Sequence, residues 1–480
     1  MTNAPIAGNS QEQAQNGEAK RESLVELAQR REGERYALHS KHLNEMWVRV
    51  LKTIGWDVGF TRGDGAYLYD RAGAQYLDLM SGYGVFALGR NHPRVRDALI
   101  EVLNSQSANL AQFDVSVLAG VLAERLLART PWLDKAFFAN SGAEAVEAAI
   151  KFARYATGRS GIVHCAHSFH GLTCGALSLN GDEIFKKGFG PLLSGVREIP
   201  FDDLGALEEA LSGHDVAAFV VEPIQGKGVN IPHADYLSSA AALCKKYGTL
   251  FVADEIQTGV GRTGKFLAIE HFGVEPDMVL LAKALSGGHA PIGVTLTRKW
   301  IFDKVFDRMD RSVVHGSTFS KNDLAMAAAL ATLDVLEDEK LIENAAAKGD
   351  RLLASFNKMA ERYELVSAVR GKGLMIGVEF GPPKSLVLRA TWNLLETASA
   401  GLFGQLICIP LFRDQKILTQ VAGHGNPTIK LLPSLTLSDE DCAWIERSFD
   451  QVIADAHHAP AVLSLGKTLA EHAIKARVNS

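Results

Sequence analysis

Short, almost purely apolar runs alternate with segments of helical spacing through the middle of the chain, from about Pro93 to Lys283. Runs that stay apolar at nearly every position are typical of parallel strands covered on both faces. The expected strands lie at 136–140, 161–167, 217–223, 250–256 and 277–283, and the clearest helices at 146–156 and 236–247. This alternation predicts an α/β fold with a mostly parallel sheet, in which ligands bind at the carboxyl ends of the strands.

Both flanks of this region carry different patterns. A helical stretch is expected from about residue 22 to 54, followed by a hairpin that turns at Gly73. After a helix at 324–336, strand patterns at 366–380 and 428–438 indicate a smaller α+β lobe. The start of the chain is expected to form a tail and its end an appended helix. We therefore expect an N-terminal segment (1–80), a large domain (81–325), and a C-terminal small domain with a terminal helix (326–480).

Bulk properties narrow the class of protein. At 480 residues the chain exceeds what one hydrophobic core usually supports, and its net charge of −5 argues against nucleic acid or an anionic membrane as main partner. Its first residues lack the layout of a secretory signal, and no apolar run reaches the length of about 18 residues that spans a bilayer. Five cysteines without a CxxC pair argue against a disulfide framework or a structural zinc site. We expect a cytoplasmic enzyme without bound metal.

Candidate chemistry gathers at the ends of the expected strands. Small residues at 140–143 allow backbone N–H groups and a helix N-terminus to face a phosphate, although Ser141 as a simple helix cap is the alternative. Phe169 and His170 follow the strand at 161–167. An aromatic ring there can stack on a planar ligand, although a core phenylalanine and an ordinary polar histidine explain the pair equally well.

A carboxylate, Asp254, and an amine, Lys283, stand at the ends of two further expected strands. Asp254 is costly to bury unless it meets a cation, and a protonated ring nitrogen is one such cation, with an ordinary salt bridge as the alternative. Lys283 can form an imine if burial keeps its amine deprotonated, and is otherwise a surface lysine. Together, a phosphate cradle, a stacking ring, an anion and an imine-forming amine are what pyridoxal phosphate (PLP) requires.

Two glycine-containing stretches imitate nucleotide-binding motifs. The stretch TGVGRTG (258–264) has GxGxxG spacing, but two carboxylates precede it and no clear helix opens at its third glycine. The stretch LSLGKT near the C-terminus lacks the first glycine of a P-loop. A dehydrogenase would rest on the first of these stretches alone, and nicotinamide titration would test it.

With these residues in place, the sequence resembles the class III aminotransferases, the family of ornithine, acetylornithine, 4-aminobutyrate and diamine transaminases. The resemblance covers about residues 65–449 and is strongest in LFVADEIQTGVGRTGKFLAIEHFGVEPDMVLLAKALSGGHAPIG; FANSGAEAVEAAIKFAR, SFHGLTCGALS, VVEPIQG and HGSTF match further family blocks in order. It implies an aspartate-aminotransferase-like PLP domain with a mostly parallel sheet and a small α+β domain built from both chain ends. It also implies a homodimer, or a tetramer formed by two such dimers.

The resemblance also implies a role for individual residues. Lys283 would form the Schiff base with PLP and move a proton during the reaction, while Asp254 would pair with the pyridine nitrogen. Gln257 would contact the ring hydroxyl, with Glu222 nearby. Phosphate contacts are expected from Ser141, Gly142, Ala143 and the neighbouring subunit's Thr318, and ring contacts from Phe169 and His170.

Three positions that handle carboxylates in amino-acid-using relatives are changed here. Leu172 and Lys430 replace arginines, and Lys227 replaces a glutamate. Because lysine cannot reproduce the planar two-point grip of a guanidinium on a carboxylate, we hypothesise that the donor is a primary amine, diamine or omega-amino compound. An ordinary amino acid held by Lys430 as a point charge is the alternative.

The segment expected to line the substrate entrance is apolar and aromatic. It contains Tyr83, Val85 and Phe86, which fits an apolar amine and an apolar aldehyde or ketone acceptor. The same scaffold also supports racemases, aminomutases and decarboxylating transaminases. Dependence on an added carbonyl acceptor separates a transaminase from a racemase, and loss of visible absorbance on Lys283→Ala would separate an enzyme from a non-catalytic homologue.

Overall fold

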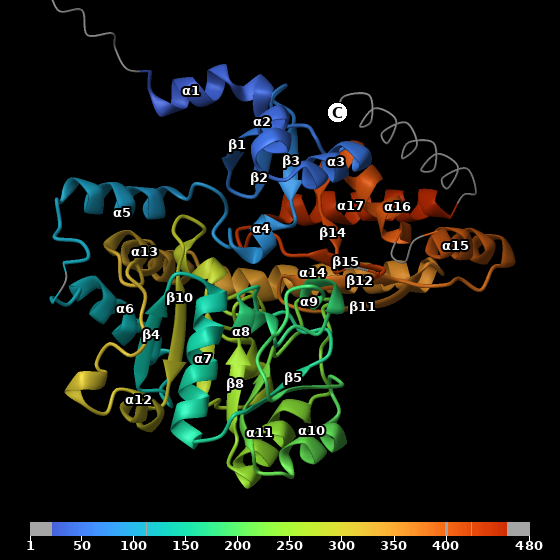
Figure 1. Ribbon diagram of the computed structural model, residues 1–480. Helices are drawn as coiled ribbons and strands as arrows, with labels where there is room; N and C mark the ends of the chain where they lie inside the picture. The colour runs from blue at the N-terminus through green and yellow to red at the C-terminus, as the bar shows by residue number, and fades with distance from the viewer. Residues whose placement is uncertain (1–21, 112, 399–401, 424, 458–480) are drawn as a thin grey trace, which may run out of the picture. The chain divides into compact units, whose positions relative to one another are not determined.

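The computed structural model describes residues 22–111, 113–398, 402–423 and 425–457 (Figure 1). The chain divides into two compact units, and the described parts of these units lie on either side of the boundary between Gly59 and Phe60. The expected N-terminal tail and the expected C-terminal helix lie outside the described residues.

The N-terminal unit is a succession of short helices. They are α1 (Leu24–Arg30), the 3-10 turn η1 (Glu32–Glu34), α2 (Arg35–His42) and α3 (Glu45–Ile54). The prediction of helix over residues 22–54 is confirmed in type, but one continuous stretch is wrong. Asn44 has extended backbone angles, and its side chain accepts a hydrogen bond from the Trp47 amide, so a new helix begins there.

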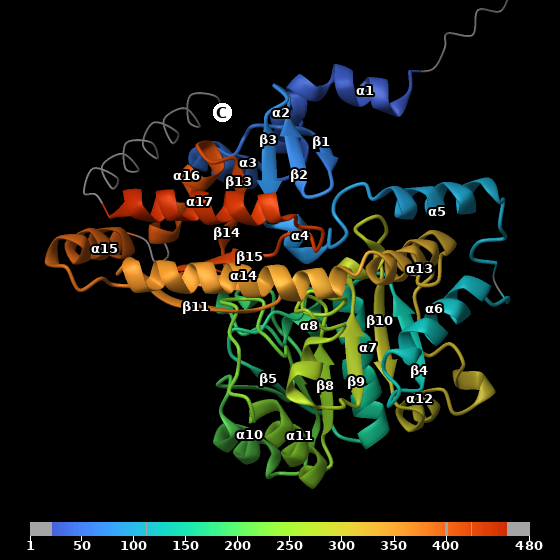
Figure 2. The same ribbon diagram turned by 180° about the vertical axis from the view of Figure 1, so that it is seen from behind.

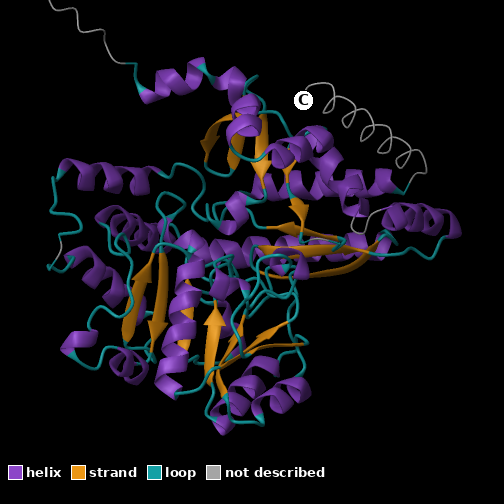
Figure 3. Ribbon diagram, in the orientation of Figure 1, coloured by secondary structure: helices purple, strands orange, loops and turns teal. Residues whose placement is uncertain are grey.

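A seven-stranded sheet forms the base of the second unit (Figure 3). In the order β4-β10-β9-β8-β7-β5-β6, its strands are β4 (Lys135–Ala139), β10 (Gly293–Thr297), β9 (Met278–Leu281), β8 (Leu250–Asp254), β7 (Val216–Val221), β5 (Gly161–Cys165) and β6 (Val196–Ile199). The strands from β9 to β6 pair in parallel, and β10 runs antiparallel to β9 and β4. The five predicted strands are present. The pattern missed β10 because its buried Thr295 and Thr297 interrupt the apolar run.

Helices accompany the strands of this sheet along the chain, and several of them pack directly on it. They are α5 (Pro93–Asn104), α6 (Val117–Ala128), α7 (Gly142–Thr157), α8 (Cys174–Leu177), α9 (Glu183–Lys186), α10 (Leu204–Leu211), α11 (Tyr236–Tyr247), η2 (Ala268–Phe272), η3 (Lys283–Ser286), α12 (Lys299–Val305), η4 (Met309–Arg311) and α13 (Asp323–Asp338). Helix α7 lies against the sheet (Figure 1). Its Ile150 and Phe152 belong to one buried apolar cluster with Val252 and Leu280 of the sheet. Burying such apolar side chains is the main favourable term in folding.

Two four-stranded sheets complete the second unit (Figure 2). One has the order β1-β2-β3-β13, with β1 (Phe60–Asp64), β2 (Tyr67–Asp70), β3 (Gln75–Asp78) and β13 (Ile417–Leu418). The other has the order β11-β12-β15-β14, with β11 (Val366–Lys372), β12 (Met375–Phe380), β15 (Thr428–Leu431) and β14 (Gln420–Val421). The remaining helices are α4 (Ser81–Gly84), α14 (Leu341–Arg362), α15 (Leu386–Ala398), α16 (Leu402–Arg413) and α17 (Asp439–Ala456). The hairpin at Gly73 is confirmed by the antiparallel pairing of β2 with β3.

Segments far apart in sequence meet in the first of these small sheets. Strand β13 pairs in parallel with β3, so residues 417–418 lie beside residues 77–78. The predicted fold class is therefore confirmed, with a large mostly parallel sheet and smaller sheets that use both ends of this unit. The domain boundaries after residues 80 and 325 stay predictions, and α13 runs through the second of them. No helix in the described part of the chain is long and apolar enough to cross a membrane.

Candidate active site

Neighbouring strands bring Asp254 and Lys283 to one edge of the large sheet. Asp254 is the last residue of β8, and Lys283 follows β9 and begins η3. Because β8 and β9 pair in parallel, with Asp254 opposite Leu280, their carboxyl ends meet at the same edge (Figure 3). Helix α7 begins at this edge too, since β4 runs in the same direction as β8. The sheet therefore gathers the predicted acid, amine and helix N-terminus.

Asp254 is held by two hydrogen bonds in a buried environment. Its Oδ2 accepts from Nδ1 of His170 at 2.6 Å, and its Oδ1 accepts from the Ile256 amide at 3.0 Å. Burial opposes a charge on His170, but the hydrogen bond and negative charge of Asp254 outweigh burial and raise the pKa of the imidazole. His170 Nε2 is buried and has no hydrogen-bond partner among the described residues. His170 and Asp254 therefore act as one polar unit.

Lys283 brings an amine with altered acid–base properties to this edge. Burial lowers its pKa below the ordinary lysine value and outweighs the attraction of Asp254 and Glu222. No hydrogen bond or ion pair of its Nζ is found within the described part of the chain. Its backbone has a φ of +41°, a conformation that non-glycine residues adopt at a cost. The arrangement favours a neutral, nucleophilic amine.

The start of α7 presents free backbone donors. Ser141 is the N-cap, and its Oγ accepts a hydrogen bond from the Glu144 amide at 3.2 Å, so the capping interpretation of Ser141 is confirmed. The amides of Gly142 and Ala143 lie in the first turn, where a helix provides no partner for them. A side chain at Gly142 would lie 2.9 Å from the Ile256 side chain, which explains the glycine. These amides and the positive end of the helix can bind an anion.

Glu222 ties the loop after β5 to the loop after β7. Its Oε1 accepts from the Phe169 amide at 3.0 Å, and its Oε2 accepts from the Gly226 amide at 2.7 Å. Burial raises the pKa of Glu222. Asn180, which sequence reasoning missed, accepts from the His170 amide at 2.8 Å. Its LNGD context looks like an ordinary turn, so nothing in the local pattern marks it.

Gln257 and Lys430 lie together on another side of this cluster. Gln257 Nε2 donates to the Tyr83 carbonyl at 3.1 Å. Lys430 Nζ donates to the Gly226 carbonyl at 2.8 Å and to Gln257 Oε1 at 3.3 Å. Burial lowers the pKa of Lys430 to about 7, and the positive charge of Lys283 adds to this effect. Strand β15 therefore contributes a buried amine whose charge depends on pH.

The structure does not bring all predicted site residues into this cluster. Phe86 stacks under the Arg90 guanidinium, 4.1 Å from its ring centre. Val85 is partly buried, whereas Tyr83 is half-exposed and has a φ of +63°. Leu172 is 58% exposed and Thr318 is exposed too. The last two side chains have no described role in the cluster of this single chain.

The family model for class III aminotransferases matches residues 54–453. The chain belongs to the class III aminotransferases. It is 35% identical over 433 residues to aminotransferase PigE of Serratia sp. (strain ATCC 39006), covering 83% of this chain and 51% of PigE. The chain thus spans about half the length of this curated relative.

Solved structures agree with this family assignment. An ornithine aminotransferase from Toxoplasma gondii ME49 superposes with a TM-score of 0.78 at 29% identity, covering 91% of this chain and 99% of that one. A PLP-bound amine transaminase from an uncultivated Pseudomonas species gives a TM-score of 0.74 at 30% identity, covering 83% and 94%. The predicted family is therefore confirmed.

The residues of this class III aminotransferase fit the cofactor that its family implies. Three observations support the fit: open amides at the start of α7, a buried carboxylate fixed by His170, and a buried lysine with a lowered pKa. A PLP phosphate, ring nitrogen and aldehyde carbon are the groups that these three features suit.

The glycine-rich stretch at 258–264 serves packing in this aminotransferase. Arg262 is fully buried, and its Nη1 donates to the carbonyls of Leu374 and Pro433 at 3.1 and 2.5 Å. A side chain at Gly264 would come within 3.0 Å of the Ala346 backbone. The glycines thus allow α14 to approach, and the stretch offers no open amide cradle for a nucleotide.

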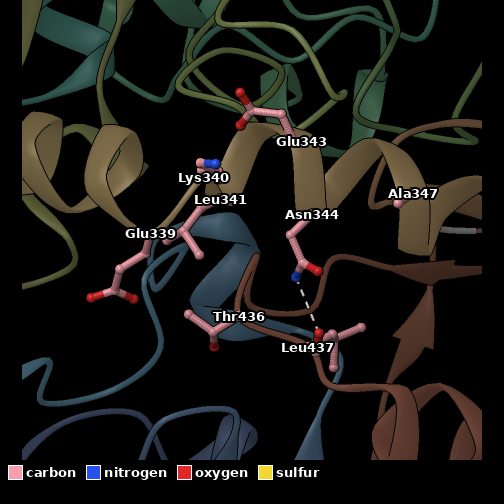
Figure 4. A pocket seen from close by; sticks show the side chains of 8 residues that line it. All are labelled: Glu339, Lys340, Leu341, Glu343, Asn344, Ala347, Thr436 and Leu437. Atoms are coloured by element: carbon pink, nitrogen blue, oxygen red, sulfur yellow. Dashed lines mark hydrogen bonds between the residues drawn. The ribbon is translucent and has the colours of Figure 1, made fainter.

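A surface hollow of about 530 Å³ lies where α14 begins (Figure 4). It is lined by Glu339, Lys340, Leu341, Glu343, Asn344, Ala347, Thr436 and Leu437. None of these belongs to the predicted site, so the hollow has no part in the chemistry proposed below. Among the described residues, no group of three or more potential ligand side chains is placed to hold a metal ion.

Proposed function

We propose that the protein is a PLP-dependent transaminase that moves an amino group from an amine donor to a carbonyl acceptor. The observation that carries the proposal is the buried His170–Asp254 pair at the same sheet edge as the Lys283 amine. Each partner meets one requirement of this chemistry: a fixed negative charge for a ring cation, and a neutral amine for an aldehyde. Family membership supports the proposal.

Named residues are proposed to hold the cofactor. The first-turn amides of Gly142 and Ala143, next to Ser141, bind the phosphate. Phe169 would lie over the ring of the cofactor, and Gln257 would contact the ring hydroxyl. PLP, when bound, supplies an aldehyde that bonds to amines and a ring that withdraws electrons from the donor carbon.

The residues of the chain then handle charge, protons and water. Asp254 would pair with a protonated ring nitrogen, because the hydrogen bond from His170 fixes the position of its carboxylate. Lys283 Nζ accepts the proton from the donor carbon and returns it, which its lowered pKa permits. Phe169 excludes water from one side.

The donor is proposed to lack an α-carboxylate. Lys430 is the side chain that would have to grip such a group, and its donors already serve Gly226 and Gln257. With a pKa of about 7, it is also only partly charged at neutral pH. An amine transaminase from an uncultivated Pseudomonas species is among the structural relatives, which supports this choice. An ornithine-type activity, with Lys430 as a point charge, is the competing assignment.

Assembly and location complete the proposal. Thr318 and its neighbour Phe319 are exposed in the single chain, which suits contribution of Thr318 to the phosphate site of a second copy in a homodimer. Four of the five free cysteines are buried thiols, and Cys174 is exposed. Free thiols suit a reducing compartment such as the cytoplasm.

A donor and acceptor screen tests the proposal. The purified protein loaded with PLP is mixed with hexylamine, putrescine, alanine or glutamate, and the loss of the cofactor's visible band is followed. We expect the band to fall with primary amines and to return on adding an aldehyde or keto acid. Tight use of glutamate as the main donor would overturn the donor class. Turnover of a single amino acid without any added carbonyl would indicate a racemase.

A further inference from the structure

Lys227 and Lys430 place two amino groups on the side of the site that holds Gly226 and Gln257. Lys430 Nζ contacts both of these residues, and Lys227 directly follows Gly226. The positive charges of Lys283 and Lys227 both act on Lys430 and help to lower its pKa. These three amines therefore belong to one electrostatic neighbourhood.

Lys227 is fixed over aromatic rings. Its Nζ pairs with Asp182 Oδ2 at 2.5 Å, and lies 4.5 Å from the ring centre of Phe185 and 5.6 Å from that of Phe169. The two rings meet edge to face at 5.7 Å. Because Phe169 is the proposed ring-stacking residue, this cation and its aromatic partners lie beside the proposed cofactor site, where a donor would bind. Neither Asp182 nor Phe185 was expected from the sequence.

The carboxylates in this neighbourhood already have partners. Glu222 accepts hydrogen bonds from two backbone amides. Asp254 accepts hydrogen bonds from His170 and from the Ile256 amide. Asp182 forms an ion pair with Lys227. A second ammonium group on a donor would therefore meet two lysines without a free carboxylate from this set. Like charges in a partly desolvated site repel over several ångströms.

A negatively charged tail meets a different situation. When protonated, Lys430 donates two of its three N–H groups to Gly226 and Gln257, and Lys227 donates one of its three to Asp182. One N–H donor then remains on Lys430 and two on Lys227, and a lysine ammonium attracts an anion as a point charge without the planar two-point grip of a guanidinium. A neutral tail that packs on Phe169 and Phe185 needs neither charge nor a partner.

We propose that Lys227 and Lys430 are specificity-determining residues that reject a second positive charge, so that the preferred donor is a monoamine with a neutral, apolar tail. The inference rests on the proposed transaminase function and narrows its donor class, because diamines become poor donors. The expected order is a neutral tail first, an anionic tail second and a cationic tail last.

Three donors of equal chain length test this order: hexylamine, ε-aminocaproate and hexamethylenediamine. With the PLP-loaded full-length protein, kcat/KM of the first half-reaction is followed by absorbance at neutral pH. We expect hexylamine to exceed hexamethylenediamine by about tenfold or more, the effect of one partly screened like-charge contact. A diamine used as well as the monoamine would overturn the inference.

A binding measurement gives a readout independent of turnover. The reduced, unreactive conjugates of PLP with each of the three amines are titrated into the apoprotein by calorimetry. The hexylamine conjugate should bind about tenfold more tightly than the hexamethylenediamine conjugate. Equal dissociation constants would contradict the inference even if transamination proceeds, whereas failure of every donor to react would contradict the proposed function instead.

Matched substitutions assign the effect to the two lysines. Lys227→Met and Lys430→Met remove the charge but keep a long side chain, and each should move the hexylamine-to-diamine ratio towards unity. Lys227→Arg and Lys430→Arg keep the charge and should keep the preference. A ratio unchanged in both methionine variants would show that these lysines do not select the donor.

Discussion

Nδ1 of His170 lies 2.6 Å from Oδ2 of Asp254, and both side chains are buried at the carboxyl end of β8. The hydrogen bond raises the pKa of the histidine and leaves the aspartate oxygen in a fixed position. Such an arrangement gives a buried carboxylate a hydrogen-bonded partner, which a buried polar group requires. The pair supports the proposal that Asp254 faces a charged ring nitrogen of the cofactor.

Replacing Asp254 by asparagine should slow the first half-reaction by about a hundredfold or more, because a neutral amide cannot stabilise a ring cation. The rate is measured by single-turnover absorbance with hexylamine. His170→Phe retains the carboxylate and serves as the comparison, with a smaller loss. An Asp254→Asn variant at nearly full rate would remove the electrostatic role assigned to Asp254.

Adding a methyl group at Gly142 should weaken cofactor binding by about tenfold, since a side chain there meets Ile256 at 2.9 Å and shifts the first turn of α7. The dissociation constant of PLP for Gly142→Ala, from titration of the apoprotein, checks this. Gly120→Ala in α6 is the matched control, because its side chain meets no atom within 4 Å. The control should gain about 0.5–1 kcal/mol in stability and keep its affinity for PLP.

Lys430 should make stability depend on pH in a defined direction. Its pKa of about 7 in the folded protein lies below the ordinary lysine value of 10.5, so the unfolded chain binds more protons between these two values. The free-energy cost of burying the Lys430 ammonium group is therefore full below pH 7 and falls as the pH rises towards 10.5. Lys283 and Lys227 increase this cost, and Glu222 reduces it.

In guanidinium unfolding of the apoprotein, Lys430→Met should gain stability relative to the parent on the acid side of this window. That gain should shrink by about 2 kcal/mol towards its alkaline end. A difference in stability that does not change with pH would show that Lys430 keeps an ordinary pKa.

Arg262→Leu should lower the free energy of unfolding by about 2 kcal/mol, because the buried carbonyls of Leu374 and Pro433 lose their donor. Guanidinium unfolding of the holoprotein measures it. Nicotinamide dinucleotides should not bind to either protein in a fluorescence titration. Saturable binding that the substitution abolishes would restore a nucleotide role for this stretch.

Much of the fold could be predicted because the apolar pattern of a single segment indicates whether that segment is buried. The apolar runs that became β7 and β8 show no polar break, and the alternation around Gly73 gave the hairpin. Other elements depend on distant partners. Strand β10 contains Thr295, whose hydroxyl donates a hydrogen bond to the Ala145 carbonyl in the folded chain. Because this partner is distant in sequence, the polar threonine made the segment look unlike a buried strand. The helical stretch at residues 22–54 broke at Asn44 for a local reason, a side-chain cap that periodicity alone does not weigh.

The candidate site also contains residues that the sequence predicts and contacts that it does not. The placement of Asp254 and Lys283 at one sheet edge was predictable because Asp254 ends β8 and Lys283 follows β9, and these two strands pair in parallel. The partners of Lys227 were not, since Asp182 is 45 residues away in a loop. The donation from Lys430 to Gly226 joins positions 204 residues apart. Contacts between loops of this kind follow from the tertiary fold and leave no periodic signal in the sequence.

The most direct test of the central claim is to reduce the PLP-loaded protein with borohydride, digest it and measure the mass of the peptide that contains Lys283. We expect the mass of the reduced cofactor on Lys283, and its absence from the Lys283→Ala protein. Cofactor mass on Lys430 or Lys227 instead, or on no lysine of a protein that has bound PLP, would contradict it.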